Sequence, residues 1–97
     1  MKIPNQIKVG GITYQILIEP IERSESGNLL LGQTNNIDNT IRINSKSAPE
    51  RQQQTFFHEL MHAVAFESSN TELYDDERTI DSVGLMLYQV FMDNFSS

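Results

Sequence analysis

The chain has 97 residues, enough for one domain and too few for two that could each bury a core. Its formal charge of −6 argues against a nonspecific nucleic-acid interface and against docking on anionic lipid, because both need clustered lysine and arginine. Cysteine is absent, so disulfides and thiolate zinc sites are excluded and any metal must be held by histidine and carboxylate. No signal peptide or membrane-spanning run is recognisable, so a cytoplasmic location is expected.

The first half of the chain, up to about residue 45, is predicted to be rich in β-strands. Runs of β-branched residues flank Gly10 and Gly11, and a Gly-Gly pair supplies the positive φ angles that a two-residue hairpin turn requires. Strands are therefore expected over Ile7–Val9 and Ile12–Ile18.

A second pair of strands is predicted after a polar surface loop at Pro20–Asn28. The letters "LLLG" at positions 29–32 indicate a short apolar strand, and a turn rich in Asn and Asp follows them. Apolar and polar residues then alternate in Thr40–Asn44, as is typical of a half-buried strand. A strand at this point can also present an open edge to an extended peptide.

A helix is predicted over about residues 48–67. Ser47 can cap it, Glu50 can bond back from three residues further on, and Pro49 is tolerated in the first turn. The stripe that anchors this helix in the core is expected to consist of Phe57, Leu60, Met61 and Val64.

A second helix is predicted over about residues 72–94, after the small polar residues of "ESSN". Its apolar stripe, expected to face a core, consists of Ile80, Val83, Leu87 and Phe91. Strands followed by helices indicate the α+β class. The expected fold is a small antiparallel sheet of about four strands packed on two helices.

The two histidines of the chain lie four residues apart in "HELMH", with Glu59 directly after the first. Residues four apart share one face of a helix, so His58 and His62 can meet a zinc ion at about 2.0 to 2.1 Å. Glu59 lies one step round the helix, where it can serve as base toward a zinc-activated water. The alternative is a chance pentad on a buried helix, and the capped amphipathic surroundings favour the metal site.

A catalytic zinc needs a third protein ligand and one open position. Without a further His or any Cys, the third ligand must be a carboxylate. The acidic residues after the pentad are Glu67, Glu72, Asp75, Asp76 and Glu77. Glu77 stands out because Asp81 follows it by four on the same helical face, so that one carboxylate can bind zinc while the other accepts the N–H of a ligand histidine. Gly84 continues this face and would let the two helices approach closely; the alternative is an ordinary acidic helix start.

These residues carry a family resemblance. "HELMH" followed by Glu77 and Asp81 resembles the gluzincin pattern, and "IKVGGITYQI" with the passage from "IRIN" to "HELMHA" resembles the very small zincin-like proteins of bacteria and phages that are grouped with the ImmA/IrrE metallopeptidases. The resemblance spans most of the chain. It implies His58, His62 and Glu77 as zinc ligands, Glu59 as catalytic base and Asp81 as the support of a ligand histidine.

Two departures from the gluzincin pattern leave alternatives open. The gap between His62 and Glu77 is shorter than in large gluzincins, so Glu72 or Asp76 can replace Glu77 as ligand. A later His is also absent, although a His or Tyr often stabilises the oxyanion in larger relatives. The groups available for that role here are Tyr74, Tyr88 and Arg78.

The expected function is that of a zinc metallopeptidase with Glu59 as general base. It would act in a bacterial cell or a phage-infected host on an unidentified peptide or protein, as a monomer or small homo-oligomer. One alternative is a catalytically inactive, zinc-stabilised protein-binding module. Another is a phage-type accessory protein with a partner interface near the end of the chain, formed by Met86, Phe91, Met92 and Phe95.

Overall fold

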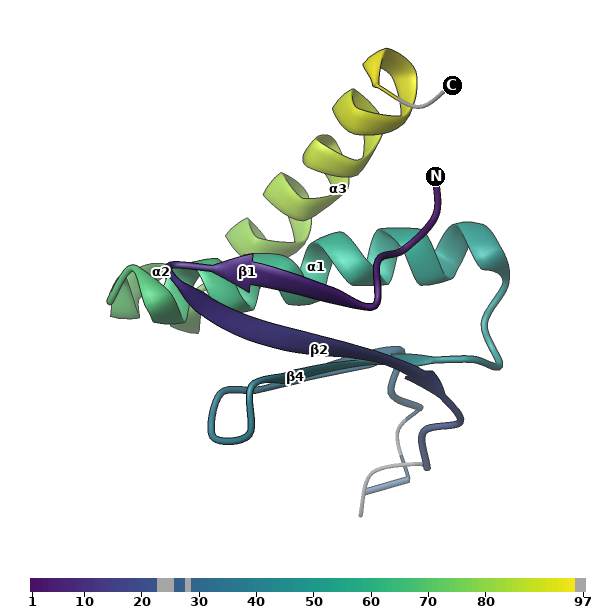
Figure 1. The fold of residues 1–97 in the computed structure, drawn as a ribbon, viewed down its shortest axis with the longest axis horizontal. Helices are drawn as coiled ribbons and strands as arrows, with labels where there is room; N and C mark the ends of the chain where they lie inside the picture. Colours follow the sequence, from purple (N-terminus) through teal and green to yellow (C-terminus); the bar gives the residue numbers. More distant parts are fainter. Residues whose placement is uncertain (23–25, 28, 96–97) are drawn as a thin grey trace.

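The computed structural model describes residues 1–22, 26–27 and 29–95. Its elements in chain order are β1 (Gln6–Val9), β2 (Ile12–Glu19), β3 (Gly32–Asn35), β4 (Thr40–Asn44), α1 (Pro49–Glu67), α2 (Thr71–Asp75) and α3 (Glu77–Asn94). The strands form one sheet and the helices follow them in the chain, which confirms the α+β class (Figure 1). Part of the polar loop expected over residues 20–28 lies outside the described residues.

The first hairpin forms where the sequence predicts it. β1 and β2 pair antiparallel with Val9 opposite Ile12, and the turn consists of Gly10 at φ 58° and Gly11 at φ 86°. Both angles lie in the left-handed region, which glycine adopts without the steric cost that other residues incur. The Gly-Gly pair therefore fixes the register of this hairpin.

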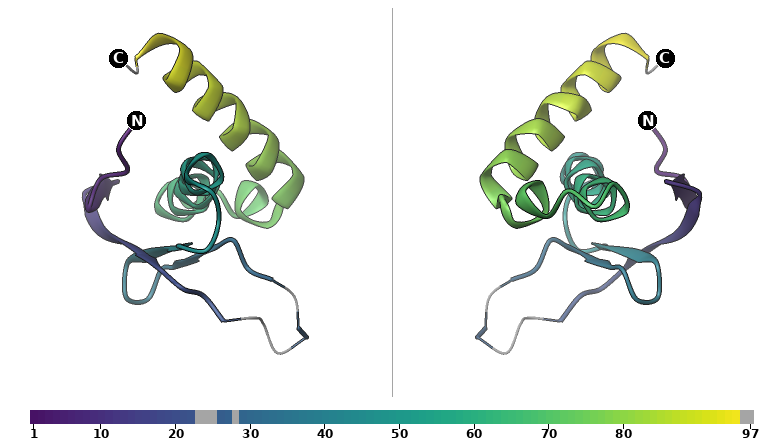
Figure 2. Two further views of the ribbon diagram at one scale, coloured as in Figure 1. Left: turned by 90° about the vertical axis from the view of Figure 1, so that its right-hand side faces the viewer. Right: turned by 90° about the vertical axis from the view of Figure 1, so that its left-hand side faces the viewer.

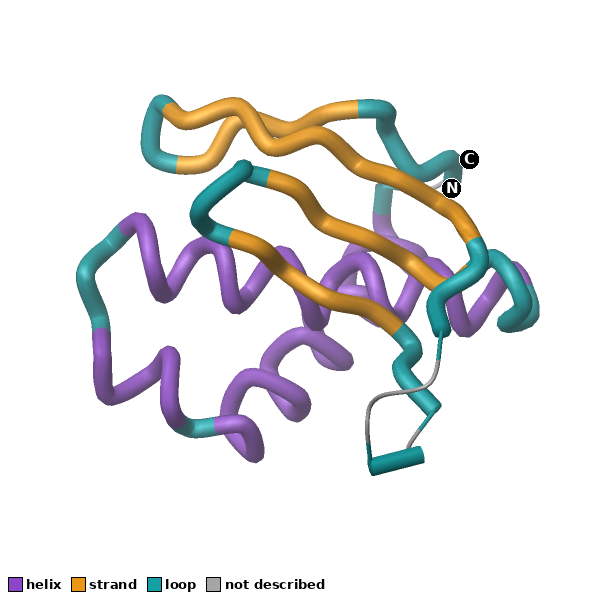
Figure 3. Tube along the Cα trace, turned by 90° about the horizontal axis from the view of Figure 1, so that it is seen from below, coloured by secondary structure: helices purple, strands orange, loops and turns teal. Residues whose placement is uncertain are grey.

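The sheet is mixed, so the prediction of an antiparallel sheet is wrong at one pairing. The strand order is β1-β2-β4-β3, and β2 runs parallel to β4 while the two hairpins are antiparallel (Figure 3). β4 takes the inner position, in which its apolar Ile41 and Ile43 have no exposed surface. The short polar β3 is left at the edge, where its unpaired backbone groups can reach solvent.

The edge strand β3 differs from the apolar strand expected in "LLLG". It consists of the polar run "GQTN", and the preceding Leu29 and Leu31 are 56% and 41% exposed. The turn sets the register, because Asn35 Oδ1 accepts hydrogen bonds from two backbone amides of the turn and Asn35 then pairs with Thr40. β3 therefore runs along β4 and leaves the leucines outside the sheet.

The helix α1, which carries "HELMH", begins at Pro49, close to the predicted start. The predicted cap is wrong, because the N-cap residue is Ala48 and makes no side-chain hydrogen bond. Ser47 Oγ instead donates to the carbonyl of Asn44 at 2.7 Å, which closes the turn between β4 and α1. Pro49 fits the first turn, where its missing N–H costs no helical hydrogen bond.

α1 is the central element, with the sheet on one side and α3 on the other (Figure 2). Phe57 belongs to the core shared with the sheet, while Met61 packs with Ile80 of α3. The expected stripe is therefore only partly right: Leu60 is half-buried and Val64 is 38% exposed. A helix covered on two sides buries residues outside a single stripe.

The second predicted helix is interrupted at Asp76, which separates α2 from α3. The Asp76 carboxylate accepts hydrogen bonds from the N–H of Thr79 at 3.1 Å and from its hydroxyl at 2.6 Å. These two bonds hold the pKa of Asp76 below its usual range. The prediction of one continuous helix is wrong because an Asp side chain in this position starts a new helix by capping it.

The apolar stripe expected on α3 is largely exposed. Ile80 and Gly84 are buried, whereas Val83, Leu87 and Phe91 are 38%, 43% and 39% exposed. Gly84 has no side chain, so α3 approaches the backbone of α1 closely at this point. The contact with α1 therefore turns the glycine face of α3 inward and leaves much of the apolar stripe in solvent.

Candidate metal centre

His58 and His62 project from α1 on the side that faces the start of α3. Their ring centroids are 5.2 Å apart and both side chains are partly buried, at 23% and 16% exposure. One helical turn separates them, as the i, i+4 spacing requires. The two imidazoles are thus presented side by side by a single rigid element.

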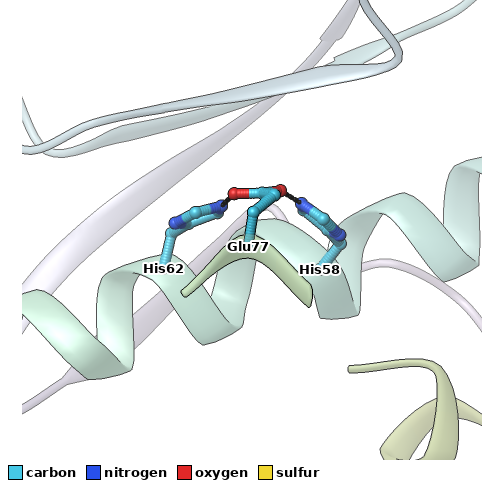
Figure 4. Close-up of side chains that lie close together, drawn as sticks. All are labelled: His58, His62 and Glu77. Atoms are coloured by element: carbon cyan, nitrogen blue, oxygen red, sulfur yellow. Dashed lines mark ion pairs between the residues drawn. The ribbon is translucent and has the colours of Figure 1, made fainter. Parts of the chain in front are cut away.

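Glu77 lies between the two imidazoles (Figure 4). Its Oε1 is 2.6 Å from His58 Nε2 and its Oε2 is 3.1 Å from His62 Nε2. Glu77 is the first residue of α3, directly after the Asp76 cap, so the capping that starts the helix also fixes the position of this carboxylate.

The three side chains form a group that could hold a metal ion. One ligand atom from each of His58, His62 and Glu77 lies within 4.8 Å of the others. Among the described residues this is the only group of three or more such ligands found. Of the two carboxylates considered in place of Glu77, Asp76 is engaged in capping α3 and Glu72 lies exposed on α2 outside the group.

Asp81 stands behind His58, one turn after Glu77. Its Oδ1 is 3.2 Å from His58 Nδ1, so it can accept the Nδ1–H and leave Nε2 as the ligating nitrogen. A neutral His58 in that tautomer directs a lone pair toward Glu77 Oε1 at 2.6 Å. A proton on Nε2 would make this contact an ion pair, and a divalent cation bound by both side chains would take the place of that proton. The donor set therefore fits a metal ion.

Glu59 is buried, with 7% exposure, whereas its place one step round the helix from His58 predicted a side chain open to a zinc-activated water. The difference arises because β3 covers it: Thr34 Oγ1 is 2.8 Å from Glu59 Oε1. Burial raises the pKa of Glu59, and the Thr34 hydrogen bond and the nearby histidines offset part of that rise. Glu59 nevertheless lines the same cleft as both histidines and Glu77.

The cleft that contains these residues has a volume of about 630 Å³. β3 forms one wall through Gly32, Gln33 and Thr34, and α1 and the start of α3 form the others. Sequence reasoning missed the residues from β3, because it assigned the strand to the leucines before them. The turn chemistry of Asn35 is the local signal that could have moved the strand to its observed place.

A protein-family profile matches most of the chain. Residues 15–88 match the sequence profile of the Peptidase M78 family, described as the IrrE N-terminal-like domain. The chain belongs to this family. The match confirms the resemblance read from the sequence, and it covers all the predicted site residues.

No match to the IrrE-like chain was found among curated proteins or among solved structures. The family name supports a metallopeptidase-like domain. In the part of the chain that the structure describes, no helix is long and apolar enough to cross a membrane.

Three residues were considered as oxyanion stabilisers in this IrrE-like domain. Tyr74 lines the cleft and stands edge-on to His62, with ring centroids 5.7 Å apart. Tyr88 is directed elsewhere, since its hydroxyl donates to Gln53 Oε1 at 3.1 Å, and neither it nor Arg78 lines the cleft. Of the three, the structure brings only Tyr74 to the site.

A partly buried hydrogen-bond network holds the Tyr74 hydroxyl in place. Tyr14 is fully buried and its hydroxyl is 2.6 Å from Glu67 Oε2 and 3.0 Å from Asn36 Oδ1. Asn36 in turn donates to the Tyr74 hydroxyl at 3.1 Å. Burial and the Glu67 carboxylate raise the pKa of Tyr14, so this residue remains a neutral donor. The network ties β2 to α1 and α2 at the end of the cleft.

Proposed function

We propose that this IrrE-like domain is a zinc-dependent metallopeptidase in which Glu59 is the general base. The observation that carries the proposal is the placement of three ligand atoms, from His58, His62 and Glu77, within 4.8 Å of one another in a cleft that Glu59 also lines. The three candidate ligands and the candidate base therefore lie in one cleft beside α1.

The donor set favours catalytic zinc over structural zinc. Two imidazole nitrogens and one carboxylate oxygen make three protein ligands, which leaves a position open, whereas structural zinc sites are usually closed by four. When bound, zinc polarises the scissile carbonyl and lowers the pKa of the attacking water. Asp81 holds His58 in the tautomer that ligates through Nε2.

Glu59 moves the proton in the proposed reaction. Its carboxylate accepts a proton from the attacking water and later gives it to the leaving amine. Burial raises the pKa of Glu59, which brings its proton affinity closer to that of an efficient base at neutral pH. Its place beside the ligands on one helix keeps the proton acceptor close to the reacting atoms.

The substrate is proposed to be an extended peptide. β3 lies at the edge of the sheet and lines the cleft, so its outer backbone groups are free to pair with another strand. A peptide paired there would run alongside α1 and present its carbonyl groups to the metal centre. The cleft thus favours an unfolded segment of a protein over a folded surface.

The proposal is tested by measuring zinc and peptide cleavage together. We expect one zinc per chain after dialysis against zinc, loss of that zinc in Glu77→Ala, and full zinc but no cleavage in Glu59→Gln. Glu72→Ala is the matched control, because it removes a nearby acidic residue outside the ligand group. Folded wild-type protein that takes up no zinc, or Glu77→Ala that keeps it, would contradict the ligand assignment.

A second function is supported by a separate observation. Large apolar side chains are exposed on α3 and directly after it, among them Met86 at 57% and the C-cap residue Phe95 at 72% exposure. Such a surface is typical of a protein-binding site, so the chain can instead be a zinc-stabilised binding module without turnover. Equal zinc content and equal inactivity of wild type and Glu59→Gln on every peptide tested would favour the module.

A further inference from the structure

The edge strand β3 is fitted closely over Glu59. A Cβ on Gly32 would lie 2.5 Å from Thr55 Cγ2 and 3.1 Å from Glu59 Cγ, so a side chain at this position would collide with α1. The absence of a side chain lets the strand lie directly on the helix. Two residues further along, this contact brings Thr34 onto Glu59.

Thr34 makes two contacts with the same residue. Its Oγ1 is 2.8 Å from Glu59 Oε1 and 3.0 Å from the carbonyl oxygen of Glu59. Within the described residues, no other hydrogen bond to the Glu59 carboxylate is seen. The orientation of this buried carboxylate therefore depends on one hydroxyl group from a neighbouring element.

A hydroxyl suits both chemical forms that a general base passes through. It has one proton to donate and lone pairs to accept with. Toward the carboxylate, Thr34 donates to Oε1. Toward the carboxylic acid, it accepts the Oε1 proton and directs its own proton to the Glu59 carbonyl, so the hydrogen bond to the carboxyl group is kept in both forms.

We propose that Thr34 is a positioning residue for Glu59, holding the carboxyl group in one place while it takes up and releases the proton. The inference rests on the proposed metallopeptidase function. β3 would then have two roles. Its outer edge would pair with the peptide substrate, and its Thr34 would align Glu59.

The kinetic test compares Thr34→Val with Thr34→Ser, using zinc-loaded protein and a mixture of internally quenched peptides. Val keeps the shape and removes the hydroxyl, whereas Ser keeps the hydroxyl. We expect Thr34→Val to lose about 10- to 100-fold in kcat, since general-base catalysis is worth about 10²- to 10⁴-fold and only its alignment is impaired. KM and zinc content should stay within about twofold and Thr34→Ser within about threefold of wild type. Thr13→Val, on the exposed face of β2, is the control for the substitution itself.

Equal losses in Thr34→Val and Thr34→Ser, a change confined to KM, or an unaffected Thr34→Val would overturn the inference. Wild-type protein that binds zinc but cleaves none of the peptides would overturn it together with the proposed function. That outcome is recognised from wild type alone, before any variant is compared.

A second measurement does not depend on activity. Urea unfolding of metal-free protein should show that Thr34→Val lowers the midpoint more in the wild-type background than in a Glu59→Leu background, where only the hydrogen bond from the hydroxyl to the backbone carbonyl of residue 59 is left to lose. Equal decreases in both backgrounds would show that Thr34 supports packing alone and would overturn its role toward Glu59.

Discussion

Substitution of Gly84 by alanine tests whether the proposed metal centre depends on the close approach of α1 and α3. A Cβ at this position would lie 3.2 Å from His58 Cα, 3.3 Å from His58 N and 3.3 Å from the carbonyl oxygen of Phe57. All three are backbone atoms of α1, so no flexible side chain can move aside. We therefore expect α3 to shift away from α1 by a few tenths of an ångström.

Two opposing effects set the magnitude. Alanine gains about 1 kcal/mol over glycine in a helix interior, whereas an overpacked contact costs about 1–3 kcal/mol. The net change should be a loss of about 0–2 kcal/mol in unfolding free energy. Zinc sites tolerate about ±0.2 Å in ligand distance, so a shift that carries Glu77 away from His58 should also weaken zinc binding by about tenfold, equivalent to about 1.4 kcal/mol.

The assay has two parts, urea unfolding of metal-free protein and zinc competition with a chelator. Ser82→Ala, at an exposed position of α3, is the control that reports improved helix propensity without a new contact. A Gly84→Ala protein that gains stability as the control does and binds zinc as wild type does would refute the reasoning.

Three further substitutions test the supports of the site by urea unfolding of metal-free protein. Gly32→Ala should cost about 1–3 kcal/mol through overpacking, and Thr55→Ser, which removes the nearest methyl group, should restore part of it; no recovery would contradict that contact. Asp76→Ala should destabilise α3, while Asp76→Asn should retain most of the cap. Because the folded pKa of Asp76 is lowered, the part of the Ala deficit that exceeds the Asn deficit should be full above the ordinary pKa of 3.8 and should be lost as pH falls through the folded value. Tyr14→Phe should cost about 1.5–3 kcal/mol, since it removes a buried donor to the Glu67 carboxylate; an unchanged midpoint would contradict the network.

Local chemistry explains what could be predicted from the sequence. The turn at Gly10 and Gly11 depends on the φ angles of two adjacent residues, and the pairing of His58 with His62 depends only on helical periodicity. The start of a helix at Glu77 is also a local property, because Asp76 caps it, although the prediction of one continuous helix missed this break. Each of these features is determined within a few residues of the chain.

Contacts between distant segments explain what could not be predicted. Either strand of the second hairpin could have paired with β2. The choice depends on burial across the whole sheet, and the apolar β4 occupies the inner position. Glu59 is buried because β3 crosses it, 25 residues earlier in the chain at Thr34. Which face of α3 is exposed follows from the close approach of the helix to α1 at Gly84. Helical periodicity alone does not predict which face of α3 turns toward α1.

The sequence by itself thus determined the chemistry of this protein: two histidines one helical turn apart, an adjacent carboxylate and an acidic residue at the start of the next helix. Only the tertiary structure decided how these groups are held. The edge strand that buries and hydrogen bonds Glu59, and the glycine contact that brings α3 onto His58, join segments far apart in the chain. Such contacts depend on shape complementarity between whole elements, which no short stretch of sequence encodes.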